Sequence, residues 1–229
     1  MKQGQVFLGI LGFSLLALAV AVYFPAQKSN VPTLTQSLPW QIEVTDDGSI
    51  RVFDLVLEQS TINDAIHRFQ ESAEVSLFVS PENTQVIEVY FNNTRLAGLR
   101  AKLVLAVSID KTQLAAIYDR GTRISTLGDG SRKVTLHPDD LLRVKQSKIA
   151  SITYLPKTRL DTELLQARFG EPGRRIRETK TTTLHWLYPD LGLDIAQDQD
   201  GRTVLQYLPP TKFEQIIQPL LEQGKEELN

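Results

Sequence analysis

The beginning of the chain is dominated by one apolar run, VFLGILGFSLLALAVAVYF, from Val6 to Phe24. The run contains no charged residue. At 1.5 Å of rise per helical residue it would span roughly 28 Å, which matches the hydrocarbon thickness of a bilayer. The pattern therefore predicts a transmembrane signal anchor over 6–24, preceded by a cytoplasmic stub over 1–5.

The same run has a second interpretation as a cleaved secretory signal. Such signals have a shorter apolar core, about 7–15 residues, followed by a small-x-small cleavage site. Ala17 and Ala19 fit that spacing, but cleavage there would leave an apolar and aromatic N-terminus. We favour a retained anchor in the inner membrane with the bulk of the chain in the periplasm, and keep secretion to the periplasm after cleavage as the alternative.

After the apolar run, residues 25–40 are rich in Pro, Ser, Thr and Gln and lack apolar periodicity, which indicates a flexible linker. Beyond it, β-branched and aromatic residues between turn signals predict strands. Ser60 precedes apolar residues spaced as on one helix face, which predicts a helix over 61–72. Further helices are expected from Asp110 to Tyr118 and over 138–146. The strands expected in this half are 41–44, 50–57, 75–79, 86–91, 99–108, 123–127 and 132–136.

The second half repeats this order of elements. A strand over 148–155 is followed by a helix that Asp161 caps, and a closing helix is expected over 211–222. Glu226 and Glu227 are expected to fray into solvent. The strands expected here are 174–178, 181–188, 191–196 and 203–208. The fold class is therefore predicted as α+β: an N-terminal single transmembrane helix, then two small modules of helix packed on antiparallel strands, over 41–147 and 148–222, with a tail over 223–229.

Two segments of the second half carry a resemblance to a known family. They are LLQARFGEPGRRI, from Leu164 to Ile176, and LHWLYPDLGLDIAQDQDGRTVLQYLPP, which begins at Leu184. A helix ending in FGxP, a strand with aromatic residues and then a hairpin resemble the small outer-membrane assembly lipoproteins of the SmpA/OmlA (BamE-like) type. The resemblance implies a BamE-like module over 148–222. The chain differs from that family in having no lipid-bearing Cys, and it also resembles uncharacterised Gram-negative envelope proteins.

Composition narrows the possible chemistry. The net charge of −2 argues against a nucleic-acid partner, and the absence of cysteine removes thiol catalysis and Cys-based zinc sites. His67, His137 and His185 stand alone, with no partner at metal-ligand spacing. Asp139 and Asp140 lie in the first turn of the helix expected over 138–146, and we interpret them as acids that interact favourably with its dipole. We expect no cofactor, no metal and no catalytic residue.

The densest basic cluster gives the candidate binding residues. Arg174, Arg175 and Arg177 lie within one short segment, and Arg168 comes just before it. Several arginines in one segment could hold an acidic partner, because guanidinium groups bind carboxylates in a bidentate way. Trp186, on the neighbouring strand, is interpreted first as a core residue.

Two functional hypotheses follow. The favoured one is a non-enzymatic, membrane-anchored periplasmic binding or scaffold protein of the cell envelope, which acts through protein–protein contacts with another envelope protein. The alternative is a carboxylate-dependent envelope hydrolase or cell-wall-processing enzyme. A deep cleft with converging acids would favour the enzyme, and a shallow groove beside a strand edge would favour binding.

Overall fold

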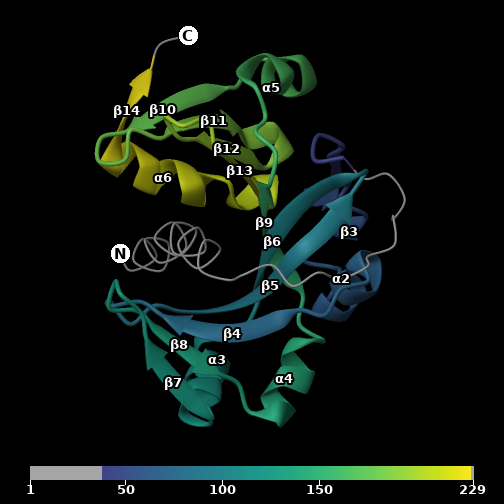
Figure 1. Ribbon diagram of the computed structural model, residues 1–229, viewed down its shortest axis with the longest axis vertical. Helices are drawn as coiled ribbons and strands as arrows, with labels where there is room; N and C mark the ends of the chain where they lie inside the picture. Colours follow the sequence, from purple (N-terminus) through teal and green to yellow (C-terminus); the bar gives the residue numbers. More distant parts are fainter. Residues whose placement is uncertain (1–37, 228–229) are drawn as a thin grey trace.

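The computed structural model describes residues 38–227 (Figure 1). The predicted stub, the transmembrane segment over 6–24 and most of the linker lie outside these residues. Within 38–227, no helix has the length and apolarity that crossing a bilayer requires. At the end of the predicted linker, the Tyr207 hydroxyl donates to the Pro39 carbonyl at 2.8 Å, so this part of the chain packs on the folded protein.

Most strands of the described residues belong to one antiparallel sheet of eleven strands, in the order β14-β10-β11-β12-β13-β9-β6-β5-β4-β8-β7. The strands of this sheet that precede β9 along the chain are β4 (Glu74–Val79), β5 (Gln85–Leu96), β6 (Leu99–Val107), β7 (Arg123–Thr126) and β8 (Arg132–Thr135). The later strands are β9 (Ile149–Pro156), β10 (Arg174–Glu178), β11 (Leu184–Tyr188), β12 (Leu193–Gln197), β13 (Thr203–Tyr207) and β14 (Gly224–Glu227).

The expected fold of two small modules is wrong, because a single sheet runs through both halves of the chain. Strand β9 pairs with β6 on one side and with β13 on the other, and so joins the two meanders. The helices flank this sheet instead of closing two separate small cores. Pairing between strands far apart in sequence leaves no local pattern of apolar residues, so periodicity alone did not reveal it.

A second, three-stranded sheet consists of β1 (Glu43–Val44), β2 (Ile50–Val52) and β3 (Leu55–Val56). The strand predicted over 50–57 is therefore a hairpin. Phe53 and Asp54 both have positive φ, 55° and 63°, and reverse the chain between β2 and β3. Two successive positive φ values are typical of a tight hairpin turn, which usually contains Asn or Gly. Phe and Asp at these positions do not match that pattern, so the turn was not predicted.

Five α-helices are described: α2 (Ile62–Phe69), α3 (Lys111–Asp119), α4 (Pro138–Val144), α5 (Thr162–Phe169) and α6 (Glu214–Gln223). Short 3₁₀ turns lie at Pro189–Leu191 and Pro210–Lys212. Thr61, not Ser60, caps α2, where its side chain and that of Asp64 form a capping box. Figure 1 shows α6 beside β10 to β13 at one end of the sheet, and α3 and α4 at the other end.

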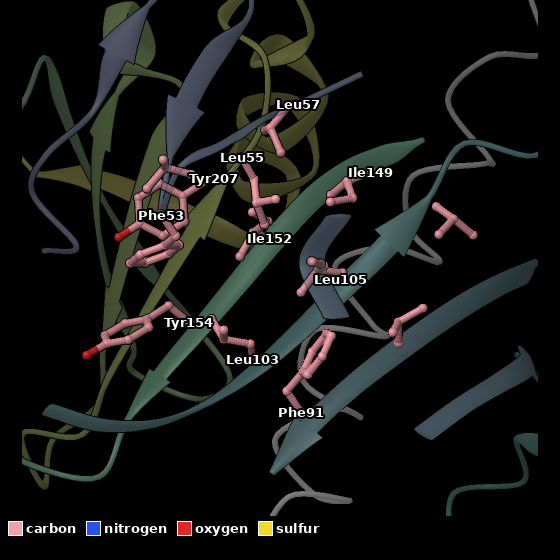
Figure 2. Close-up of a cluster of buried hydrophobic side chains, with 14 of the residues drawn as sticks. Phe53, Leu55, Leu57, Phe91, Leu103, Leu105, Ile149, Ile152, Tyr154 and Tyr207 are labelled. Atoms are coloured by element: carbon pink, nitrogen blue, oxygen red, sulfur yellow. The ribbon is translucent and has the colours of Figure 1, made fainter. Parts of the chain in front are cut away.

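The main core covers one face of the sheet, which we call the core face. Figure 2 shows Phe53 and Leu55 packed with side chains of the central strands, among them Tyr154 and Tyr207. The Phe53 ring lies 5.4 Å from that of Tyr154 and 5.5 Å from that of Tyr207, centroid to centroid. The β2–β3 turn is thus anchored by aromatic contacts to the middle of the sheet.

A smaller core lies on the opposite face, which we call the α6 face. Here α6 and the segment before it cover Ile176 of β10 and Leu187 of β11. Side chains alternate between the faces along each strand, and directly paired residues share a face. The register of the ladder therefore decides which polar residues lie on the same face as α6.

Candidate functional site

The predicted arginine cluster is centred on β10, next to the edge of the sheet. Strand β10 lies between β11 and the short C-terminal strand β14. The ladder with β14 is antiparallel and pairs Ile176 with Glu226 and Arg175 with Glu227. The expectation that these two glutamates fray into solvent is wrong, because their backbone forms the outermost strand.

Two of the arginines bind the acidic side chains of β14. Arg174 holds Glu226 through two hydrogen bonds of 2.8 Å, and Arg177 pairs with Glu227 through Nε and Nη2. These hydrogen bonds lower the pKa of each glutamate and raise that of Arg174. The geometry is the bidentate fork that guanidinium and carboxylate groups favour.

The other two arginines bind aromatic rings. Arg175 lies 5.1 Å from the centroid of the Trp186 ring and donates to Glu171 at 2.7 Å. Arg168, on α5, lies 4.8 Å from the centroid of the Trp40 ring. The structure thus brings Arg174, Arg175 and Arg177 together on β10, while Arg168 belongs to a different contact. Trp186 is buried in the main core, as interpreted from the sequence.

Strand β14 is held almost entirely by its backbone ladder and these ion pairs. Its sequence, GKEE, contains no apolar side chain. It follows α6 with no intervening residue, so the chain turns directly at Gly224. A Cβ atom at this position would lie 2.6 Å from the Arg177 carbonyl oxygen and 2.8 Å from Ile176 Cγ2, so only glycine fits the turn.

A second cluster of charges lies buried on the α6 face. His185 of β11 pairs directly with Ile176, so its side chain shares the face that α6 covers. Its Nδ1 lies 2.9 Å from Asp194 Oδ2, and its Nε2 lies 3.4 Å from Glu178 Oε1. All three residues are at most 6% exposed. Thr181 donates a further hydrogen bond to Glu178.

The two carboxylates keep this imidazole charged. Burial alone would lower the pKa of His185, but the Asp194 carboxylate, assisted by Glu178, raises it to about 10. The hydrogen bond from His185 in turn lowers the pKa of Glu178 in spite of its burial. A buried ion cluster without solvent access fixes strand packing and does not present an acid or base to a substrate.

Sequence reasoning missed this cluster. It treated His185 as an isolated strand residue, although Asp194 follows nine positions later in the next strand. A signal was available in the two strands, LHWLY and LDIAQ, which flank one short turn. Each strand is otherwise mainly apolar and contains one histidine or acidic residue, His185 in the first and Asp194 in the second.

A third group of charges lines a pocket over β4, β5, β6 and β8. The pocket has a volume of about 20 Å³, room for little more than one water molecule. Glu74 forms an ion pair with Lys133, whereas burial raises the pKa of Glu88 to about 8, with Lys133 opposing the shift. Two carboxyl groups thus line one pocket, with a raised pKa on Glu88.

The other histidines and acids singled out from the sequence lie away from these clusters. His67 is exposed on α2, and His137 caps α4, where Nδ1 accepts from the Asp139 amide at 3.3 Å. Asp140 is buried and binds Arg120 through two hydrogen bonds of 2.7 and 2.9 Å, which ties α4 to the end of α3. Within residues 38–227, no group of His, Asp and Glu side chains is arranged to hold a metal ion.

Comparison with protein-family models, with curated proteins and with solved structures finds no match to this chain. The resemblance to the SmpA/OmlA (BamE-like) type therefore stays a prediction from sequence.

Proposed function

We propose that this chain is a non-enzymatic binding protein of the cell envelope, and that it holds another protein at strand β10, next to the edge of the sheet. The single observation that carries the proposal is the pairing of Arg174 and Arg177 with two consecutive glutamates of an added strand. Strand addition combines backbone hydrogen bonds for affinity with side-chain contacts for specificity. The edge thus has the chemistry of a peptide-binding strand.

The apolar run over 6–24 gives this proposal its location. A retained anchor would hold the binding edge at the periplasmic side of the inner membrane, whereas cleavage would release it into the periplasm. N-terminal sequencing of the mature protein distinguishes these outcomes. We expect Met1 at the terminus, and a start near Val20 would contradict the anchored form.

Position-specific photocrosslinking in cells tests the binding function. A photoreactive residue at exposed Lys180, in the turn that follows β10, is compared with one at Leu142 of α4, which is 64% exposed. We expect a discrete adduct with another envelope protein from position 180, lost on Arg174→Glu/Arg177→Glu substitution, and none from position 142. Equal adducts from both positions, or none from either, would contradict the proposal.

A carboxylate-dependent envelope hydrolase is the second candidate, favoured by the pocket that Glu74 and Glu88 line. Burial raises the pKa of the Glu88 carboxyl to about 8, which suits a general acid, and Glu74 supplies a second carboxyl group in the same pocket. The small volume of the pocket requires that it open to admit a substrate. Hydrolysis of a cell-wall preparation that is lost in Glu88→Gln and retained in the exposed control Glu82→Gln would favour the hydrolase over the binding protein.

A further inference from the structure

Building on the proposed function, we infer that β14 is an exchangeable strand that occupies the binding site for an acidic, extended segment of the partner. The partner segment pairs antiparallel with β10 in place of residues 224–227. It carries two consecutive acidic residues, which take the positions of Glu226 and Glu227.

The register of β14 defines this requirement. Glu226 pairs directly with Ile176 and so lies on the α6 face, where it reaches Arg174. Glu227 pairs directly with Arg175 and lies on the opposite face, where it reaches Arg177. Because alternate residues of a strand point to opposite faces, two adjacent acidic residues place one carboxylate on each face and satisfy both arginines together. An isolated carboxylate would engage one of them.

The interactions that hold β14 are of the kind that exchange readily. The side chains of Arg174 and Glu226 are 31% and 46% exposed, and those of Arg177 and Glu227 are 41% and 38% exposed. Ion pairs at such exposure contribute little to stability and weaken with salt. The strand buries no apolar side chain, whereas β10 beneath it contributes Ile176 to the small core.

The link to α6 makes exchange possible without unfolding the sheet. Leu220 and Phe213 anchor α6 in the small core, and the chain leaves that core at Gly224. Release of residues 224–227 therefore breaks the β14 ladder, the two ion pairs and the hydrogen bond that Thr179 donates to the Gln223 carbonyl. Strands β10 to β13 retain their pairing and the cover of α6.

Peptide binding to the full chain tests the inference. The probe is a fluorescein-labelled peptide with the sequence of residues 221–227, LEQGKEE, followed by fluorescence anisotropy. The open variant is Glu226→Lys/Glu227→Lys, whose lysines repel Arg174 and Arg177. The matched control, Glu82→Lys/Glu163→Lys, makes the same charge change at two exposed glutamates elsewhere. Gly224→Ala is a second open variant that keeps the glutamates but blocks the turn.

We expect each open variant to bind the peptide at least tenfold more tightly than the unaltered chain or the control variant. A peptide in which both glutamates are replaced by glutamine should bind with at least tenfold lower affinity. Addition of 0.5 M NaCl should weaken the binding of the acidic peptide. Equal affinity for the acidic and neutral peptides, or no gain in either open variant, would overturn the inference. A Gly224→Ala chain that dimerises without binding peptide would overturn it in favour of strand exchange between two copies.

These outcomes are distinct from failure of the proposed function. Crosslinks from position 180 without peptide selectivity would leave a binding protein whose partner does not replace β14. If neither the crosslinks nor the peptide selectivity is observed, the proposed binding function itself is contradicted.

Discussion

The two charge clusters beside β10 have similar chemistry and opposite surroundings. Glu178, at the end of the strand, joins His185 and Asp194 in a cluster that is at most 6% exposed. Arg174 and Arg177, on the same strand, pair with glutamates whose side chains are 46% and 38% exposed. Burial makes the first cluster a fixed part of the sheet, and exposure leaves the second open to exchange with another acidic segment.

The comparison assigns different roles to charges that look alike in the sequence. A buried charge that loses its partner remains uncompensated in a low-dielectric environment, so removal of one member of the buried cluster strongly destabilises the fold. An exposed charge that loses its partner is hydrated by water at little cost.

The largest effect is expected from Asp194→Ala. This change leaves His185 buried with only the longer contact to Glu178, so the free energy of unfolding should fall by about 3–5 kcal/mol. Urea denaturation followed by circular dichroism measures it. The control is Asp200→Ala in the exposed β12–β13 turn, which should change stability by less than about 0.5 kcal/mol. A loss of stability no larger than that of the control would show that the buried cluster does not hold the strands.

The second prediction concerns the pH dependence of stability. The folded protein keeps the His185 proton up to a pKa of about 10, whereas a histidine in the unfolded chain has its ordinary pKa of 6.5. The stabilisation is therefore complete below about pH 6.5 and is lost as the pH rises toward 10. The measurement starts at pH 8, because the buried Glu88 has a pKa of about 8 and contributes its own pH dependence below that value. Between pH 8 and 9.5 the free energy of unfolding should fall by about 2 kcal/mol.

Urea titrations at several pH values measure this slope. His185→Leu should abolish the fall between pH 8 and 9.5, at the expense of lower stability throughout. His67→Leu, which removes an exposed histidine, is the matched control and should keep the fall. An unchanged slope in His185→Leu would exclude the buried imidazole as its source.

A smaller effect is expected from Gly224→Ala. The added Cβ would meet the Arg177 carbonyl oxygen at 2.6 Å, so the turn must open and stability should fall by about 1–3 kcal/mol. Gly128→Ala is the control, because no atom lies within 4 Å of its added Cβ. Thermal denaturation of the two variants gives the comparison, and equal melting temperatures would show that the α6–β14 turn is not constrained as described.

The smallest effect is expected from Glu226→Gln and Glu227→Gln. Each removes one exposed ion pair and should lower the free energy of unfolding by less than about 1 kcal/mol. The difference from the unaltered chain should shrink further in 1 M NaCl, where exposed charges are screened. A loss as large as that of Asp194→Ala would mean that the edge pairs are structural and not exchangeable.

Most local elements could be predicted from the sequence. The apolar spacing around Ile62 and Phe69 predicted α2, and Asp110 caps α3 by accepting from the Gln113 amide at 2.9 Å. These features depend on residues a few positions apart, which is where pattern and capping chemistry act. The predicted strands β4 and β6 agree with the structure to within one residue at each end.

The single sheet and the candidate site depended on long-range contacts. Strand β9 pairs with β6 and β13, which are separated from it by whole helices, and no local signal records those pairings. The sequence GKEE has low strand propensity and was interpreted as a frayed end, yet β10 offers a complementary charge for each glutamate. The arginines were predicted as a binding cluster, but the acidic segment that satisfies two of them was not recognised.

Native-state hydrogen exchange tests most directly whether β14 is exchangeable while the rest of the sheet is fixed. Amides of the β10–β14 ladder are compared with those between β11 and β12, over a series of low denaturant concentrations. We expect the β14 ladder to exchange at least a hundredfold faster, through a local opening insensitive to denaturant, and the β11–β12 amides to exchange only with global unfolding. Exchange of both sets at the same, denaturant-dependent rate would contradict the exchangeable strand.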